Sequence, residues 1–247
     1  MLAELPTRAD REPVVGAGMG GDDTTAIDAA AERAILRRFE SVDDALTIVS
    51  EELGVKGNGS TYVVVDPIDG SLNAKRGIRF FSLSVAVASG PTMADVDFGF
   101  VHDFGTNEEW VARVGGGAEL NGVPLDGEGP KDRIEILSFE ATQTASVAEK
   151  AGAVVDLAYR LRIMGSLALS LCHLAAGRVD AVCSLKPARS VDIAAAQLLV
   201  RERGLAIALP DDDLPFGDAK LDLEGRSRVV AAGNSELCRQ LTAALSA

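Results

Sequence analysis

The pattern of apolar and polar residues divides the chain into short elements with two different periods. Between residues 25 and 39, apolar side chains recur at helical spacing, as in Ile27, Ala31 and Ile35, which predicts an amphipathic helix. Further along, β-branched and apolar runs bounded by glycine, proline or asparagine predict strands. In the first half of the chain these strands cover residues 46–50, 61–65, 80–89, 96–102 and 109–114. We expect a polar loop at residues 56–60 and a glycine-rich turn with a hairpin tip at residues 115–122.

The second half of the chain alternates between the two periods. Gly177 and Gly204 stand where two of its predicted helices end, as expected for glycine just past a helix C-terminus. We predict strands at residues 134–139, 159–164, 179–185, 205–209 and 228–232, and helices at 144–151, 167–176, 191–203 and 236–245. This alternation is typical of an α/β lobe. We therefore expect an α+β lobe over residues 1–140 and an α/β lobe over residues 141–247 that completes the site.

Composition excludes several functional classes. A net charge of −13 with dispersed acids argues against a nucleic-acid partner, which needs a basic patch. No apolar run reaches membrane-spanning length, and no basic segment followed by an apolar stretch opens the chain, so we expect no membrane association, no export signal and a cytoplasmic protein. Lysine is much rarer than arginine, which indicates either adaptation to high salt or genomic base composition. The three cysteines, far apart in sequence, are expected to be buried and reduced.

One segment carries more chemical information than any other. The strand-like Val63-Val64-Val65 leads directly into Asp66-Pro67-Ile68-Asp69-Gly70-Ser71-Leu72-Asn73. Strands that deliver carboxylates into a loop commonly build sites for hard cations, which prefer oxygen ligands. Gly70 allows the backbone to approach a ligand closely, so the amides of Gly70 and Ser71 are candidate donors to phosphate oxygens.

Other acidic residues stand at predicted strand ends or helix starts, namely Asp28, Glu51, Glu52 and Asp192. Each has an ordinary explanation when taken alone. Asp28 could be a solvated helix residue, the glutamate pair could be surface charge, and Asp192 could be an acid that favours a helix N-terminus. Their order along the chain, rather than any one of them, is informative.

Together these residues resemble the inositol monophosphatase/fructose-1,6-bisphosphatase superfamily of magnesium-dependent, lithium-sensitive sugar phosphatases. The resemblance rests on Thr25-Ala26-Ile27-Asp28, Glu51-Glu52, the Asp66–Asn73 segment, Gly115–Gly122 and Ser190-Val191-Asp192-Ile193-Ala194-Ala195, in that order. It implies a layered αβαβα sandwich and a metal-activated water that attacks a phosphate monoester. The implied metal ligands are Glu51, Asp66, the backbone carbonyl of Ile68, Asp69 and Asp192. They would hold about two or three Mg²⁺ ions.

The same resemblance assigns the remaining roles. Glu51 is expected to hold the ion that activates the water, while Asp28 and Ser71 work as a pair that orients it. Ser71 stands where threonine is commoner, Val191 where tryptophan is usual and Ala196 where glycine is usual. The last two changes are similar to the archaeal branch with dual activity. Family members usually carry a long helix before the first landmark, but few residues precede it here and Pro6 and Pro13 interrupt them, so either that helix is missing or the true start lies upstream.

Substrate selection is read from a few further residues. Arg189 precedes Asp192 closely enough to lie beside the substrate and could hold a second phosphate, or it could pair with a neighbouring acid. Gly165 and Ser166 open a helix after a strand, where sugar hydroxyls could dock. We expect fructose-1,6-bisphosphate or inositol-1-phosphate as substrate, and a homodimer. The alternatives are a 3′-phosphoadenosine 5′-phosphate phosphatase of the same superfamily and a non-catalytic relative that binds phosphate.

Overall fold

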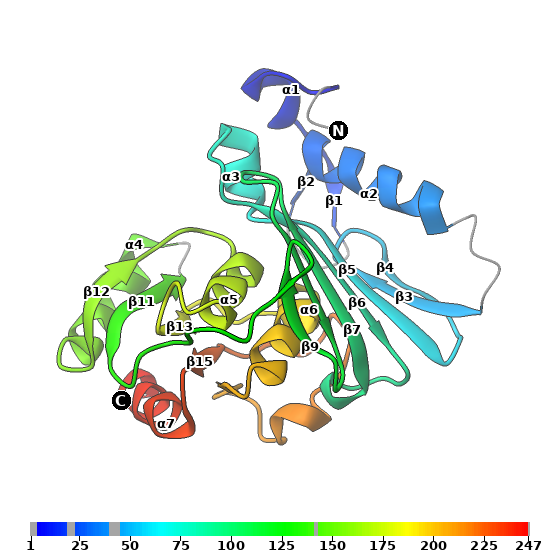
Figure 1. Cartoon of the computed structure of the whole chain (residues 1–247). Helices are drawn as coiled ribbons and strands as arrows, with labels where there is room; N and C mark the ends of the chain where they lie inside the picture. Colours follow the sequence, from blue (N-terminus) through cyan, green and yellow to red (C-terminus); the bar gives the residue numbers. More distant parts are fainter. Residues whose placement is uncertain (1–3, 19–22, 40–44, 141–142, 247) are drawn as a thin grey trace.

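The described residues fold into two large β-sheets separated by helices, with a small two-stranded sheet near the N-terminus (Figure 1). This computed structural model describes residues 4–18, 23–39, 45–140 and 143–246. At the N-terminal end, α1 (Arg8–Arg11) is a single turn, and β1 (Val14–Ala17) pairs with β2 (Asp23–Thr25). The helix at this end is thus short, as the two prolines predicted.

The larger sheet has eight strands in the order β10-β9-β8-β7-β6-β5-β3-β4. All neighbours are antiparallel except β3 and β5. One element was missed, since residues 54–57 form edge strand β4 where a polar loop was expected to begin. The strands are β3 (Leu46–Ser50), β4 (Gly54–Gly57), β5 (Thr61–Asp69), β6 (Ser82–Ala88), β7 (Val96–Asp103), β8 (Glu109–Arg113), β9 (Gly117–Leu120) and β10 (Val123–Pro124).

The smaller sheet has five strands in the order β12-β11-β13-β15-β14. They are β11 (Ile134–Glu140), β12 (Ala158–Arg162), β13 (Ala181–Ser184), β14 (Ala206–Ala208) and β15 (Val230–Ala232). Strand β11 pairs with both β12 and β13. The chain therefore passes from the large sheet to the small sheet between β10 and β11. A lobe boundary after residue 140, as proposed from the sequence, would separate β11 from the other strands of the small sheet.

Helices complete five layers, which confirms the predicted αβαβα sandwich. Helix α2 (Ala26–Phe39) contacts β5, and α3 (Ser71–Arg76) contacts α2, on one face of the large sheet. Helices α5 (Leu167–Ala175) and α6 (Ser190–Glu202) contact strands of both sheets, so they form the middle layer (Figure 1). The outer layer holds α7 (Ser235–Ser246) and α4 (Thr144–Lys150). The 3₁₀ turns are η1 (Met93–Asp95), η2 (Ala151–Val154) and η3 (Phe216–Asp218).

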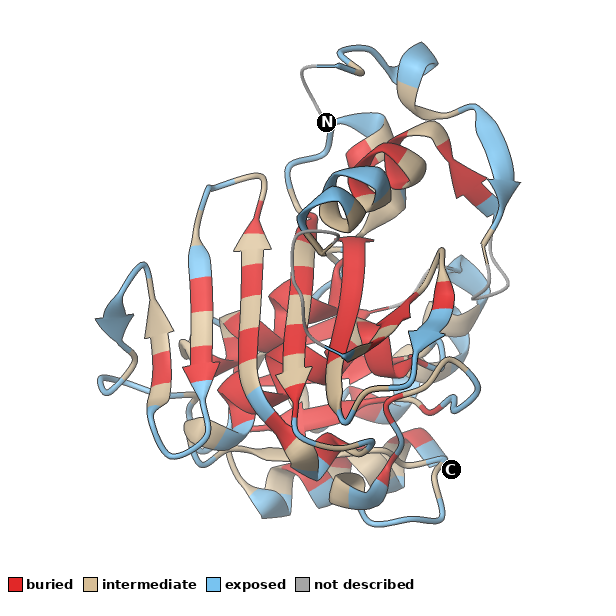
Figure 2. Ribbon diagram, turned by 90° about the vertical axis from the view of Figure 1, so that its right-hand side faces the viewer, coloured by how far each residue is buried: buried red, intermediate tan, exposed pale blue. Residues whose placement is uncertain are grey.

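The middle layer is the most apolar part of the molecule and fixes α6 against the large sheet. Helices α5 and α6 bury nearly every side chain, whereas α2 exposes one side (Figure 2). A Cβ atom at Gly99 of β7 would lie 2.5 Å from the carbonyl oxygen of Ala195, so the close approach of α6 requires glycine there. This packing brings the N-terminus of α6 to the ends of β3 and β5.

Along the described residues, no helix combines the length and the apolar character that crossing a lipid bilayer would require.

Candidate active site

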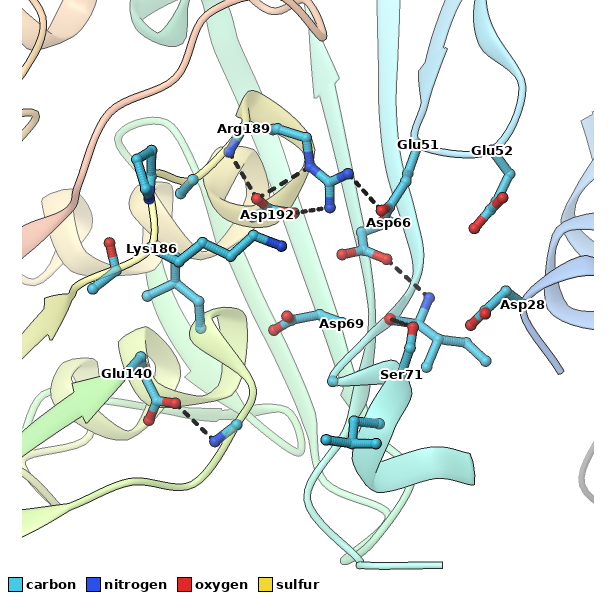
Figure 3. A pocket seen from close by; sticks show the side chains of 18 of the residues that line it. Asp28, Glu51, Glu52, Asp66, Asp69, Ser71, Glu140, Lys186, Arg189 and Asp192 are labelled. Atoms are coloured by element: carbon cyan, nitrogen blue, oxygen red, sulfur yellow. Dashed lines mark hydrogen bonds and ion pairs between the residues drawn. The ribbon is translucent and has the colours of Figure 1, made fainter. Parts of the chain in front are cut away.

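A pocket of about 350 Å³ lies where the ends of both sheets meet the N-terminus of α6 (Figure 3). Every residue assigned a role from the sequence, except Ser166, lines this pocket. The lining also includes polar residues that received no role, namely Asp23, Glu52, Lys75, Glu140, Ser184 and Lys186. The structure therefore brings together acids that are far apart in the sequence.

Three carboxylates form the centre of the pocket. Glu51 directly follows β3, Asp66 lies within β5, and Asp192 stands in the first turn of α6. One oxygen atom of each lies within 4.8 Å of the others. Asp66 is 2% exposed, and its Oδ1 accepts a hydrogen bond of 3.0 Å from the amide of Ile68, which holds its side chain toward the other two acids.

Asp69 lies beside this group of three rather than within it. Its Oδ2 accepts 2.5 Å from the hydroxyl of Ser166 and 2.7 Å from the amide of Ala168. The side chain faces the middle of the pocket from the opposite side to Asp192 (Figure 3). Ser166 is the N-cap residue of α5, so the N-terminus of this helix fixes the position of Asp69.

The residues predicted to dock sugar hydroxyls already have partners within the protein. The Ser166 hydroxyl donates to Asp69 and accepts from the amide of Leu169, while the amide of Gly165 donates to Glu140. Gly165 lines the pocket, whereas Ser166 is 1% exposed. In this structure the polar groups of the turn therefore form hydrogen bonds that hold the site together.

Arg189 lies among the acids. Its Nη1 is 2.5 Å from Glu51 Oε1, and its Nη2 is 3.1 Å from Asp192 Oδ1. The guanidinium thus contacts two of the three central carboxylates (Figure 3). The sequence left two interpretations of Arg189, binding of a second phosphate or pairing with an acid. The structure contains the pairing with acids.

Asp28 and Ser71 face the pocket without the direct hydrogen bond that pairing would give. Asp28 Oδ2 accepts from the amide and hydroxyl of Thr25, at 3.1 and 2.5 Å, and its buried Oδ1 has no hydrogen-bond partner among the described residues. The Ser71 hydroxyl donates 3.0 Å to the carbonyl of Ile68. Both side chains therefore retain acceptor capacity for a further molecule.

Glu51, Asp66 and Asp69 bind protons more tightly than ordinary carboxyl groups do. Burial raises the pKa of Glu51 to about 7, although Arg189 opposes the shift. Burial also raises the pKa of Asp69 to about 7, against the hydrogen bond from Ser166. The pKa of Asp66 is raised well above its usual range by burial and then by the charges of Glu51 and Asp69. Burial is the main cause of all three shifts, and repulsion between neighbouring carboxylates adds to the shift of Asp66.

The donor set fits a hard cation. It consists of carboxylate oxygens, with the Ile68 carbonyl beside them, and Mg²⁺ and Ca²⁺ prefer such oxygen ligands. The Asp28 oxygen without a partner adds a buried acceptor at the same pocket. A cation bound here would favour the ionised form of these buried carboxylates.

Glu140 is the residue of this pocket that sequence reasoning missed most clearly. It ends strand β11, and its carboxylate accepts 2.7 Å from the amide of Gly165. An acid at the end of an apolar strand is the signal that identified Asp66, and the same signal was present at Glu140. Lys186, just beyond β13, carried no comparable signal.

Comparisons with known proteins agree with this architecture. Residues 7–247 match the model of the inositol monophosphatase family. A protein of Methanothermobacter thermautotrophicus named fructose-1,6-bisphosphatase/inositol-1-monophosphatase is 34% identical over 249 residues, covering 96% of this chain and 88% of the relative. An Archaeoglobus fulgidus protein of the same name is 32% identical, covering 94% and 87%.

A solved structure gives the same result for the fold. The crystal structure of an inositol monophosphatase–fructose 1,6-bisphosphatase superposes with a TM-score of 0.85 at 29% identity, covering 99% of this chain and 93% of that chain. The family match spans almost the whole sequence and includes every acid of the pocket. The chain belongs to the inositol monophosphatase family and is accordingly a metal-dependent phosphatase.

Proposed function

We propose that this protein hydrolyses sugar phosphate monoesters with Mg²⁺, and that fructose-1,6-bisphosphate and inositol-1-phosphate are its main substrates. The observation that carries the proposal is the convergence of Glu51, Asp66 and Asp192 within 4.8 Å at one end of a pocket. The names of the archaeal relatives support this choice of substrates.

Glu51, Asp66, the Ile68 carbonyl, Asp69 and Asp192 would hold the cations. About two or three Mg²⁺ ions match this number of oxygen donors. Bound Mg²⁺ would neutralise phosphoryl oxygens and lower the pKa of a water molecule. Groups of the protein itself are proposed to orient the water and to bind the phosphate.

Asp28 and Ser71 are proposed to orient the attacking water. The Ser71 hydroxyl donates to Ile68, so its own lone pairs remain able to accept a hydrogen bond from water. The Asp28 oxygen without a partner is a second acceptor, and it can take the proton that the water loses. This arrangement requires no direct bond between the two side chains.

The substrate's phosphate is proposed to bind at the start of α3. Gly70 has φ of +93°, a conformation that suits glycine, and a Cβ there would lie 2.9 Å from the carbonyl oxygen of Gly165. The amides of Gly70 and Ser71 are the proposed donors. Lys75 and Lys186 line the pocket and provide positive charge for an anionic substrate. Two assignments remain predictions: that Arg189 binds a second phosphate, and that Gly165 and Ser166 bind sugar hydroxyls.

The test is phosphate release from a panel of substrates. Purified protein is assayed with fructose-1,6-bisphosphate, inositol-1-phosphate and 3′-phosphoadenosine 5′-phosphate, each with Mg²⁺ and with a chelator. We expect release from the first two only when Mg²⁺ is present, and a large loss in Asp69→Asn. Preference for the nucleotide would favour the sibling phosphatase. Absence of release from every compound, with phosphate bound, would support a non-catalytic relative.

We also propose a cytoplasmic homodimer. Cys172, Cys183 and Cys238 are buried and free, which suits a reducing compartment. The dimer is an expectation from the family resemblance, and light scattering of the purified protein tests it.

A further inference from the structure

Glu140 is a buried carboxylate, and within the described part of the chain its hydrogen bonds come from neutral donors. It is 6% exposed at the end of β11. Oε1 accepts from the hydroxyls of Ser138 and Ser170, at 2.9 and 2.8 Å, and from the amide of Met164 at 3.3 Å. Oε2 accepts 2.7 Å from the amide of Gly165. The carboxylate therefore fastens the backbone turn at residues 164–165 to the small sheet.

That turn is in close contact with the aspartate-containing segment of the large sheet. Gly165 has φ of +93°, and the side-chain amide of Asn73 donates 2.7 Å to the carbonyl of Met164. A Cβ at Gly165 would lie 2.9 Å from the Asn73 side chain. Because no space separates the two segments, a shift of the turn must shift the residues that it touches.

The turn also leads directly to the groups that hold Asp69. Ser166 and Ala168 both donate to Asp69 Oδ2, at 2.5 and 2.7 Å. With Oδ2 occupied, the carboxylate plane is set and Oδ1 is the oxygen left for the pocket. Glu140 is thus connected to Asp69 through Gly165 and Ser166, across the interface between the two sheets.

We propose that Glu140 is a positioning residue for Asp69. By holding the turn at residues 164–166, it sets the orientation in which Asp69 meets a cation. The inference rests on the proposed function, in which Asp69 is a metal ligand. Residues that orient metal ligands typically contribute about 10- to 100-fold to metal affinity or activity.

Two substitutions separate the geometry of Glu140 from its charge. Glu140→Asp keeps the charge but shortens the side chain, so it no longer reaches the amide of Gly165. Glu140→Gln keeps the length: its amide oxygen can accept from Gly165 and its NH₂ can donate to the hydroxyls of Ser138 and Ser170, so that only the 3.3 Å hydrogen bond from the amide of Met164 is lost. A positioning role predicts damage in the first variant and rescue in the second.

Metal binding is measured without reference to catalysis, by titrating metal-free protein with Mn²⁺ and following free Mn²⁺ by electron paramagnetic resonance. For Glu140→Asp we expect apparent Mn²⁺ affinity and kcat to fall by about tenfold or more, with KM changed less than about threefold. Glu140→Gln should stay within about threefold of the wild type in all three quantities.

Glu202→Asp is the matched control. Glu202 also fastens a glycine turn with its carboxylate, accepting from the amides of Gly115 and Gly117 at 3.1 and 2.9 Å, but it does not line the pocket. Its shortening should leave Mn²⁺ affinity unchanged.

Two outcomes would overturn the proposal: Glu140→Asp within about twofold of wild type in Mn²⁺ affinity, or Glu140→Gln as damaged as Glu140→Asp. Wild-type protein that binds Mn²⁺ but hydrolyses no sugar phosphate would refute the proposed function alone, because the Mn²⁺ titrations would still decide the role of Glu140.

Discussion

The guanidinium of Arg189 forms ion pairs with Glu51 and Asp192, at 2.5 and 3.1 Å, within the proposed metal site. A positive charge of the chain itself therefore lies against two of the three central carboxylates. All three side chains are nearly buried, with 10%, 14% and 15% exposed respectively. Removal of this charge leaves acids that are costly to keep ionised without a partner.

The first prediction concerns the competition between Arg189 and cations. Arg189→Met should destabilise the metal-free protein by about 3 kcal/mol, the size expected for breaking a buried pair. Added Mg²⁺ should then raise the thermal midpoint more than in wild type, because no guanidinium competes for Glu51 and Asp192. Differential scanning fluorimetry with Mg²⁺ or chelator measures both effects. Arg228→Met is the control, since Arg228 pairs with Asp211 at 2.6 Å outside the pocket; an equal Mg²⁺ response in all three proteins would contradict the prediction.

The second prediction concerns substrate selectivity. Once cations occupy Glu51 and Asp192, the Arg189 guanidinium loses those partners and becomes able to hold a second phosphate. Arg189→Ala should therefore lower kcat/KM for fructose-1,6-bisphosphate by about tenfold or more. Inositol-1-phosphate, with one phosphate, should lose much less. Equal losses on both substrates would place Arg189 in the framework of the site.

The third prediction concerns Asp66. Asp66→Asn removes a buried charge while its side-chain oxygen can still accept from the amide of Ile68. The metal-free protein should become more stable, by about 1 kcal/mol, whereas Mg²⁺-dependent turnover should fall by about 100-fold. In the control Asp180→Asn, a carboxylate that accepts from the amides of Lys131, Glu135 and Ile136 is changed outside the pocket. That variant should lose stability and keep its response to Mg²⁺. Wild-type turnover by Asp66→Asn at limiting Mg²⁺ would exclude it as a ligand.

The fourth prediction concerns the pair Asp28 and Ser71. If both hold one water molecule, either substitution already misplaces it, so the losses in kcat should be non-additive. A double-mutant cycle with Asp28→Asn and Ser71→Ala measures this coupling. Since Asp28 and Ser71 make no direct hydrogen bond, coupling would have to pass through a bound molecule. Strict additivity would show that they act separately.

The fifth prediction concerns pH. The pKa values of Glu51 and Asp69 are raised to about 7 from ordinary values of 4.5 and 3.8, so the folded protein binds these protons more tightly than the unfolded chain. Their contribution to stability is therefore fully present below about pH 4 and is lost as the pH rises through about 7. In chelator, the thermal midpoint should fall between about pH 5 and about pH 8.

The double variant Glu51→Gln/Asp69→Asn serves as the reference, because every other titrating group is present both in it and in the wild type. His173, whose pKa burial lowers, acts in the opposite direction at acidic pH and is present in both proteins. Subtracting the curve of Glu51→Gln/Asp69→Asn should therefore isolate the two acids. A difference curve that is flat across this range would show that neither acid has a raised pKa.

Much of the fold was accessible from local pattern. The strand at residues 61–65, the α2 stripe and the C-terminal glycines of α5 and α6 follow from periodicity and backbone preference, and the structure confirms them, although β5 continues beyond the predicted end to Asp69. Strand β4 was missed because Gly54-Val55-Lys56-Gly57 has no strong strand preference and gains its pairing from β3. Helix α3 is too short for its period to be visible.

The sequence by itself determined which acids this protein has, their order, and the two residues, Pro67 and Ile68, that separate Asp66 from Asp69. Only the tertiary structure decided what those acids contact. Arg189 reaches Glu51 across 138 residues, and Ser166 reaches Asp69 across 97, because α5 and α6 pack between the two sheets. Contacts of that kind depend on how whole layers are placed against one another, which no local spacing records. Glu140 stands at the end of an apolar strand, a signal that the sequence also carries, but its contacts with Gly165 and Ser170, and through them its place in the site, became visible only in the folded chain.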